Sequence, residues 1–158
     1  MKTRKELRGF LAARGIEHEI LELKSQTYTV GQASSLTGAS AKEIAKTLVL
    51  ISEDGVPVAV VVRGDKRVPQ RWLAKELGLN RLRLARPHEV LEVTGYAAGG
   101  VPPVDLPGNI VVVVDEDLLT KDSIITGGGD ESSLLKISPL DIVKLNPGSR
   151  VLKVPKEL

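Results

Sequence analysis

The sequence contains no cysteine, two histidines and only four aromatic residues among its 158 positions. Without cysteine the chain can form neither a disulfide nor a thiolate metal site, and it has no cysteine nucleophile. Because His18 and His88 are the only imidazoles, a zinc enzyme or a Ser-His-Asp hydrolase is disfavoured. We expect both histidines to be structural or at the surface, and we expect no metal and no cofactor.

Long apolar runs are also absent. The longest, Val58 to Val62 and Ile110 to Val114, have the length of a strand, whereas a helix that spans a bilayer needs about 20 apolar residues. No signal-peptide core follows the basic N-terminus. We therefore expect a cytoplasmic protein that binds no membrane, with one domain over residues 1–158 that buries its own core.

The charge is unevenly distributed although the net charge is only +2. The segment from Arg63 to Arg86 contains eight basic and two acidic residues, a net charge of +6, which leaves −4 for the rest of the chain. Such an asymmetry favours contact between this segment and a polyanion. A solvated helix face is the plainer alternative.

Capping signals and apolar patterns predict an α+β domain. Hairpins alternate with short helices, and the regular β-α-β order of a parallel sheet is absent, so we expect a mixed, partly closed, barrel-like sheet flanked by short helices. The helices are predicted to begin at the capping boxes Thr3–Glu6 and Ser40–Glu43 and near Pro69, Pro87 and Ser138. About seven strands are predicted, at 18–23, 47–51, 58–62, 81–84, 110–114, 123–125 and 134–137, with 150–154 as a further candidate.

Three short stretches carry the chemistry. Lys46 stands where a predicted helix passes into a buried-type strand, so its ammonium can enter a cleft and hold a phosphate or a polarised carbonyl. The glycine-rich loops 95–102 and 125–129 can expose backbone N–H groups that stabilise an oxyanion. Neither loop has the Walker or Rossmann pattern, which disfavours nucleotide hydrolysis. The plainer alternatives are a solvent-facing lysine and two ordinary turns.

The ordered set of motifs resembles the YbaK/ProX family, the free-standing relatives of the editing domain of bacterial prolyl-tRNA synthetases. The resemblance covers about residues 25–145 and implies hydrolysis of the ester between a wrong amino acid and tRNA, most often tRNA for proline. The matching motifs are Lys46-Thr47-Leu48-Val49, Val62-Arg63-Gly64-Asp65, Arg83-Leu84-Ala85, Thr94-Gly95-Tyr96-x-x-Gly99-Gly100-Val101-x-Pro103, Val114-Asp115, Gly127-Gly128 and Ile137-Ser138-Pro139 with Asp141.

From the resemblance we expect an aminoacylated tRNA 3′ end as the partner, with prolyl-tRNA synthetase as a further candidate. A hydroxyl of the terminal ribose would assist the attack of water, so no protein base would be needed. The residues implied as catalytic are Lys46, Gly100 and Gly128. Those implied as substrate-binding are Tyr28, Thr47, Arg63, Asp65, Gly99, Val101, Pro102, Thr126, Gly127, Gly129 and Asp130. The basic segment would contact the tRNA backbone through Lys66, Arg67, Arg71 and Lys75.

Two positions depart from some branches of the family. Leu134 or its neighbour stands where those branches carry an aspartate or a histidine, and Leu23 where some carry a tyrosine. The sequence therefore leaves open which small amino acid, such as cysteine, alanine or serine, is removed. It also leaves two alternatives: a non-catalytic tRNA- or synthetase-associated module with the same pocket, and a small-molecule binder with an anion pocket at Lys46, which the basic segment disfavours.

Overall fold

The computed structural model describes residues 1–23 and 30–156, and this part of the chain forms eight strands and five α-helices. The helices are α1 (Arg4–Ala13), α2 (Val30–Thr37), α3 (Gln70–Leu77), α4 (Pro87–Thr94) and α5 (Pro139–Leu145). The strands are β1 (His18–Glu22), β2 (Ala45–Ser52), β3 (Pro57–Arg63), β4 (Leu82–Leu84), β5 (Val111–Asp115), β6 (Ile124–Gly127), β7 (Ser133–Ile137) and β8 (Arg150–Leu152). Two 3₁₀ turns, η1 (Ala41–Glu43) and η2 (Glu116–Thr120), complete the set.

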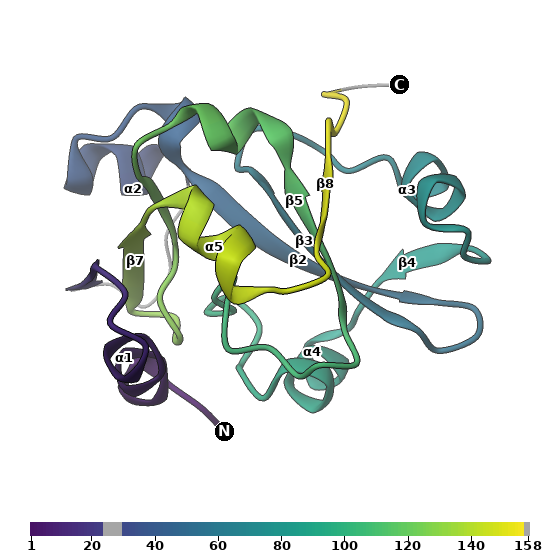
Figure 1. Ribbon diagram of the computed structural model, residues 1–158, viewed down its shortest axis with the longest axis horizontal. Helices are drawn as coiled ribbons and strands as arrows, with labels where there is room; N and C mark the ends of the chain where they lie inside the picture. The colour runs from purple at the N-terminus through teal and green to yellow at the C-terminus, as the bar shows by residue number, and fades with distance from the viewer. Residues whose placement is uncertain (24–29, 157–158) are drawn as a thin grey trace.

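The strands form two sheets rather than one (Figure 1). A five-stranded sheet has the order β4-β2-β3-β5-β8, and a three-stranded sheet has the order β1-β7-β6. The pairs β3–β5 and β5–β8 are parallel and the others are antiparallel, so the predicted mixed α+β class is confirmed. The barrel-like closure is not confirmed, because only an isolated bridge between Ile44 and Ile125 joins the two sheets in the described chain.

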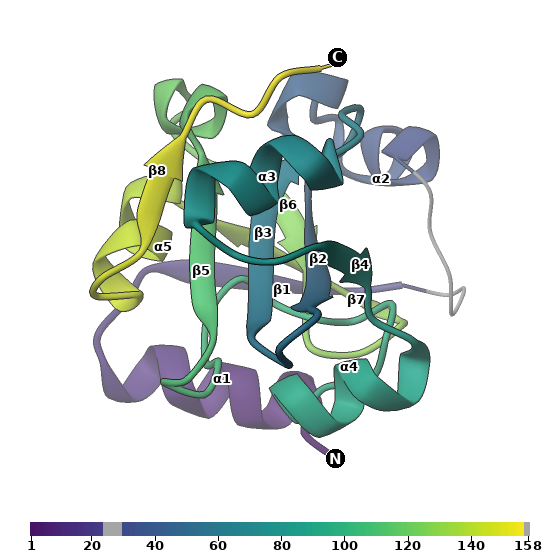
Figure 2. The ribbon, with the colours of Figure 1, turned by 90° about the vertical axis from the view of Figure 1, so that its right-hand side faces the viewer.

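Three apolar clusters hold these layers together. The largest lies between the sheets and includes Leu7 and Leu11 of α1. A second lies beneath α3, which covers β3 and β5 on the outer face of the larger sheet (Figure 2). The third lies beneath α2 and contains Ile44 and Leu134. Side chains alternate between faces along a strand, so β2 contributes to different clusters from its two sides.

Two local predictions need correction. The helix expected from Ser40 is only the 3₁₀ turn η1, and Lys46 lies inside β2, because pairing with β3 starts at Ala45. The helix α2 was not predicted from the sequence, since its segment has a glycine in the first turn, two serines and little amphipathic pattern. Its one fully buried alanine, Ala33, packs in the cluster with Ile44, so tertiary contact stabilises a helix of weak propensity.

Within the described residues, no helix combines the length and the apolar character needed to cross a membrane.

Candidate functional site

Lys46 is a half-buried cation near the start of β2. It lies opposite Val62 of β3, on the face of β2 that also carries Ile44 and Leu48. Within the described chain its ammonium makes no hydrogen bond and no ion pair. Burial lowers the pKa of Lys46 below its usual value, the nearby Asp65 carboxylate opposes this effect, and the Arg67 guanidinium adds to it. An ammonium held in this way gains stability when an anion or a polarised carbonyl oxygen approaches.

This electrostatic arrangement predicts opposite effects of two substitutions. Asp65→Asn should lower the pKa of Lys46 further, because it removes the negative charge that favours the protonated amine. Arg67→Ala should raise the pKa of Lys46, because it removes a like charge. NMR titration of the lysine side chains, with the Lys46 signal assigned through its loss in Lys46→Arg, measures both shifts. Shifts of the same sign would show that the two charges do not act on Lys46 as described.

Two threonine hydroxyls near this strand are buried without partners. The oxygen atoms Oγ1 of Thr47 and Thr126 have no hydrogen-bond partner among the described residues, and Thr126 is completely buried. Thr47 points to the face of β2 opposite Lys46, toward the space between the sheets. The bridge between Ile44 and Ile125 places the start of β2 beside β6, which carries Thr126. An unsatisfied buried hydroxyl costs about 1–3 kcal/mol, so each of these two groups would be stabilised by a hydrogen-bond partner.

The two glycine loops pack against each other rather than facing an open cleft. The Gly129 N–H donates to the carbonyl oxygen of Gly100 at 2.8 Å, and the Gly128 N–H donates to that of Ser133 at 3.1 Å. The Gly100 N–H donates to the carbonyl oxygen of Ala97 at 3.1 Å. These N–H groups are therefore occupied, and the expectation that Gly100 and Gly128 present free donors to a ligand is not met in this structure.

The need for glycine at these positions is steric. A Cβ on Gly100 would lie 2.5 Å from Cα of Asp130, and a Cβ on Gly127 would collide with the Val101 carbonyl oxygen. Gly129 has φ of +102° and packs against the backbone of Arg4. The two loops thus bring 99–102, 127–130 and the start of α1 into backbone contact. Pro102 is buried beside Val101 in the same region, and only Gly99 of these loop glycines is exposed.

Gly128→Ala should lower the free energy of unfolding by about 3 kcal/mol, the upper end of the usual cost of overpacking. Its Cβ would lie 2.6 Å from the Ser133 carbonyl carbon and 2.7 Å from the Leu134 nitrogen, and neither atom can move without disturbing the β6–β7 pair. Gly108→Ala is the matched control, since its Cβ would meet nothing within 4 Å. Chemical denaturation of both variants tests this, and equal stabilities would contradict the steric account.

Several other predicted site residues are engaged in contacts within the protein. Asp130 accepts hydrogen bonds from the Arg4 N–H and from the hydroxyls of Ser132 and Ser133. Burial raises the pKa of Asp130, but these hydrogen bonds outweigh it and bring the pKa below its usual value. Asp130 is therefore an anchor for α1, and both of its carboxylate oxygens accept hydrogen bonds from within the protein.

Arg63 and Asp65 form a bidentate pair with each other. The Arg63 guanidinium donates to Asp65 at 2.9 and 2.6 Å, and it also lies 4.0 Å from Asp117. This pairing lowers the pKa of Asp65, mainly through the hydrogen bonds from Arg63. The Asp65 carboxylate of this pair is the negative charge that raises the pKa of Lys46.

Lys66 does not lie on the surface, so its predicted contact with the tRNA backbone is wrong. It is 2 % exposed, and its ammonium donates to Asp115, Asp117 and the carbonyl oxygen of Val154. By contrast Arg67, Arg71 and Lys75 are exposed and make no ion pair with any described residue. The sequence could not tell the buried cation from the exposed ones, because Lys66 and Arg67 are adjacent, yet the first side chain is buried and the second is exposed.

The remaining positions are placed as follows. Tyr28 lies outside the described residues. Leu23 and Leu134 both pack in the apolar cluster beneath α2, and Leu134 is completely buried beside Ile44 and Ile125. Leu134, which together with its neighbour was matched to the position where some branches of the resembled family carry a polar side chain, is therefore a core residue.

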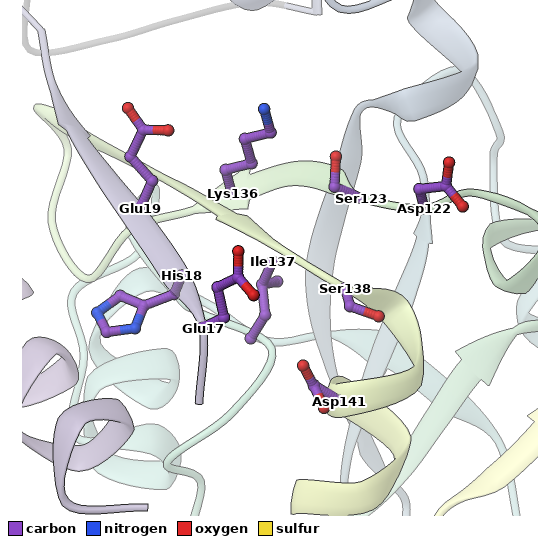
Figure 3. Close-up of a pocket in the computed structure, with 9 residues that line it drawn as sticks. All are labelled: Glu17, His18, Glu19, Asp122, Ser123, Lys136, Ile137, Ser138 and Asp141. Atoms are coloured by element: carbon purple, nitrogen blue, oxygen red, sulfur yellow. The ribbon is translucent and has the colours of Figure 1, made fainter. Parts of the chain in front are cut away.

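A hollow of about 310 Å³ lies at the far end of β7 from the glycine loops (Figure 3). Figure 3 shows Lys136 and Glu19 on neighbouring strands pointing to the same side of the smaller sheet, with Asp141 below them at the start of α5. The hollow is lined by Glu17, His18, Glu19, Asp122, Ser123, Lys136, Ile137, Ser138 and Asp141. It holds four carboxylates and one lysine and none of the predicted site residues, so its charge disfavours an anionic ligand.

A second hollow contains residues that the sequence did not single out as functional. Trp72 and Lys156 line a groove together with Arg67 and Arg71. The single tryptophan next to a basic residue was a usable signal for Trp72. Lys156 could not be found in this way, because only the fold brings the last strand and its extension back to α3.

Comparison with known proteins gives a consistent result. The family model of the aminoacyl-tRNA editing domain matches residues 24–145. The protein YwhH of Bacillus subtilis is 29% identical over 126 residues, 80% of each chain. The proline–tRNA ligase of Citrifermentans bemidjiense is 33% identical over 127 residues, which is 77% of this chain but only 22% of the ligase. The chain thus corresponds to about a fifth of the ligase.

Solved structures show the same fold. A candidate trans-editing enzyme for prolyl-tRNA synthetase is 32% identical with a TM-score of 0.85, covering 96% of this chain and 95% of that chain. The hypothetical protein APE2540 is 42% identical, also with a TM-score of 0.85, covering 94% of this chain and 98% of that chain. In both comparisons the match extends over nearly the whole of each chain.

Proposed function

The chain belongs to the aminoacyl-tRNA editing domain family, and we propose that it is a trans-editing deacylase that hydrolyses the ester of a mischarged tRNA. The observation that carries this proposal is Lys46, a half-buried ammonium without an anionic partner in the described chain and with a lowered pKa. An electropositive group of this kind suits the ester carbonyl or the terminal phosphate of an aminoacylated 3′ end.

The reaction can proceed without a protein base. Water adds to the ester carbonyl, the bond between the carbonyl carbon and the ribose oxygen breaks, and a free amino acid and a ribose hydroxyl result. The ester is already activated, so positioning and charge stabilisation supply the acceleration. We assign the first contact with the developing oxyanion to Lys46. A neighbouring ribose hydroxyl assists the attack of water.

Two hydroxyls on the side of β2 opposite Lys46 are also assigned to substrate binding. Thr47 and Thr126 carry hydroxyls that are buried without partners, and a ligand amino or hydroxyl group would satisfy them. The two glycine loops form the wall behind them in this proposal. Asp65, held by Arg63, favours the protonated form of Lys46 and so opposes the effect of burial on its pKa.

A deacylation panel tests the proposal. Transfer RNA for proline is charged separately with proline, alanine, cysteine or serine and incubated with and without the protein. Selective loss of one non-cognate ester supports the deacylase and identifies its amino acid. The sizes of these amino acids differ by about one methyl group, which limits discrimination to about 10–200-fold. Loss of the prolyl ester at the same rate as the others would argue against an editing role.

A second candidate is a non-catalytic module that binds tRNA or a synthetase through the same surface. The buried apolar Leu134 favours it, because no carboxylate or imidazole stands at that place to assist water. No hydrolysis of any ester, at concentrations where tRNA binding is measured, would favour this module. Either role places the protein with prolyl-tRNA synthetase in the cytoplasm, where tRNA is charged.

A further inference from the structure

A groove of about 690 Å³ runs beside the first turn of α3. It is formed by the segment before the helix, the helix itself and the C-terminal extension that follows β8, and we call it the α3 groove. Its lining is Arg67, Val68, Pro69, Gln70, Arg71, Trp72 and Lys156. Three of these seven residues are cationic and none is acidic, so the groove attracts negative charge.

Trp72 supplies an aromatic wall. It is the only tryptophan of the chain and is half-buried, with part of its side chain packed on the apolar cluster beneath α3. The rest of the side chain lines the α3 groove. A ring fixed by the core on one side and open to a groove on the other is suited to stacking against a nucleobase.

The cations of the groove are free to bind phosphate. Arg67 and Arg71 are exposed and pair with no acid in the described chain. The Lys156 side chain is 66% exposed, and its ammonium lies 3.8 Å from Asp65, at the outer limit of an ion pair. Other cations of the basic segment, such as Arg63 and Arg83, form short bonds to carboxylates instead. Two arginines without an acidic partner in the described chain, Arg67 and Arg71, therefore line the same groove as the aromatic ring.

The segment that leads into the groove leaves the sheet beside the start of β2, since Arg63 pairs with Ala45 and the Gly64 N–H donates to the Ile44 carbonyl oxygen at 2.8 Å. Arg67 lines the groove, and Asp65 lies beside its Lys156. These two residues are also the charged groups that act on Lys46. A strand whose terminal ester lay at Lys46 would therefore pass its preceding phosphates and bases along the α3 groove.

We propose that the α3 groove binds the single-stranded 3′ end of tRNA, with one base stacked on Trp72 and the phosphates held by Arg67, Arg71 and Lys156. This inference rests on the proposed function, since it names how the substrate of that site is held. The proposed site distinguishes a single strand from a duplex, because bases inside a duplex are stacked on their neighbours and have no free face to offer the ring.

Tryptophan fluorescence provides a direct test, since the only tryptophan reports from the groove. An uncharged RNA hairpin with a single-stranded 5′-ACCA-3′ end should quench this fluorescence at low salt, and the quenching should weaken as salt is added. The same hairpin trimmed to a blunt end should quench little. Equal quenching by the blunt hairpin would overturn the proposal in favour of duplex binding. No quenching by either RNA would also overturn it.

Two Trp72 variants distinguish base stacking on the ring from a purely structural role of this residue. Trp72→Ala should weaken binding of a labelled ACCA hairpin, measured by anisotropy, about 10-fold, whereas Trp72→Phe should keep most of it. Leu140→Ala, at an exposed leucine on α5, is the matched control and should bind as the wild type does. If Trp72→Phe binds as weakly as Trp72→Ala, or if neither variant loses affinity, base stacking on this ring is excluded.

The same measurements separate RNA binding in the α3 groove from ester hydrolysis at Lys46. Binding of uncharged RNA requires no ester hydrolysis, so selective ACCA binding without deacylation would support the α3 groove and contradict the deacylase. Deacylation with normal KM in Trp72→Ala would support the deacylase and overturn the role of the α3 groove.

Discussion

Replacement of Lys46 by alanine should lower ester hydrolysis on the mischarged tRNA at least about 100-fold, the usual scale for loss of one group that stabilises an oxyanion. The ammonium is partly desolvated and forms no ion pair with any described residue, so its interaction with a substrate oxygen is stronger than in water. The fold should tolerate the change, since removal of an unpaired, half-buried cation leaves no carboxylate without its partner.

The assay compares single-turnover deacylation by wild type, Lys46→Ala and Lys42→Ala. Lys42 is the matched control, because it lies on the surface in η1, four residues away, and belongs to no ion pair in the described chain. Thermal unfolding confirms that each variant folds. If Lys46→Ala hydrolyses the ester at the wild-type rate, Lys46 does not take part in the reaction.

Replacement of Lys66 by alanine should lower the free energy of unfolding by about 3–5 kcal/mol, the cost of breaking a buried ion pair from one side. Its ammonium lies 2.8 Å from the Asp115 carboxylate, which is completely buried, and also holds Asp117 and the Val154 carbonyl oxygen. Without Lys66 the Asp115 carboxylate remains in the core, and the segment after β8 loses its attachment to the sheet.

Chemical denaturation measures the loss, with Arg67→Ala as the neighbouring surface control, expected within about 0.5 kcal/mol of the wild type. The double variant Lys66→Met with Asp115→Asn should recover part of the stability, because it removes both buried charges. A loss below about 1 kcal/mol in Lys66→Ala would show that the pair contributes no more than a surface salt bridge.

Much of the fold follows from local patterns. The capping box at Thr3 and Glu6 forms as expected, and the helix that it opens ends before Gly15. The apolar runs that contain Val60 and Val113 become the two central strands β3 and β5. These predictions succeed because caps, turns and short apolar runs depend on neighbours in the sequence.

The candidate site was predictable only in part. The apolar run after Lys46 predicted the strand that follows it. The position of Lys46 inside that strand was not predicted, because pairing with β3 from Ala45 overrides a short helical signal. The role of the glycines changed as well. Their sequence pattern is compatible with exposed N–H groups or with close backbone contact. The close approach of Gly100 to the Asp130 backbone shows that glycine is needed there for close contact.

The sequence by itself determined the family, the order of most strands and helices, the absence of thiol chemistry and the basic character of the segment from Arg63 to Arg86. Only the tertiary structure decided which of those cations are exposed and can bind a negatively charged ligand. It buried Lys66 against Asp115 and left Arg67 facing solvent beside Trp72. The reason is physical: a charge pattern is a property of the chain, whereas pairing and desolvation depend on which distant residues the fold brings within a few ångströms.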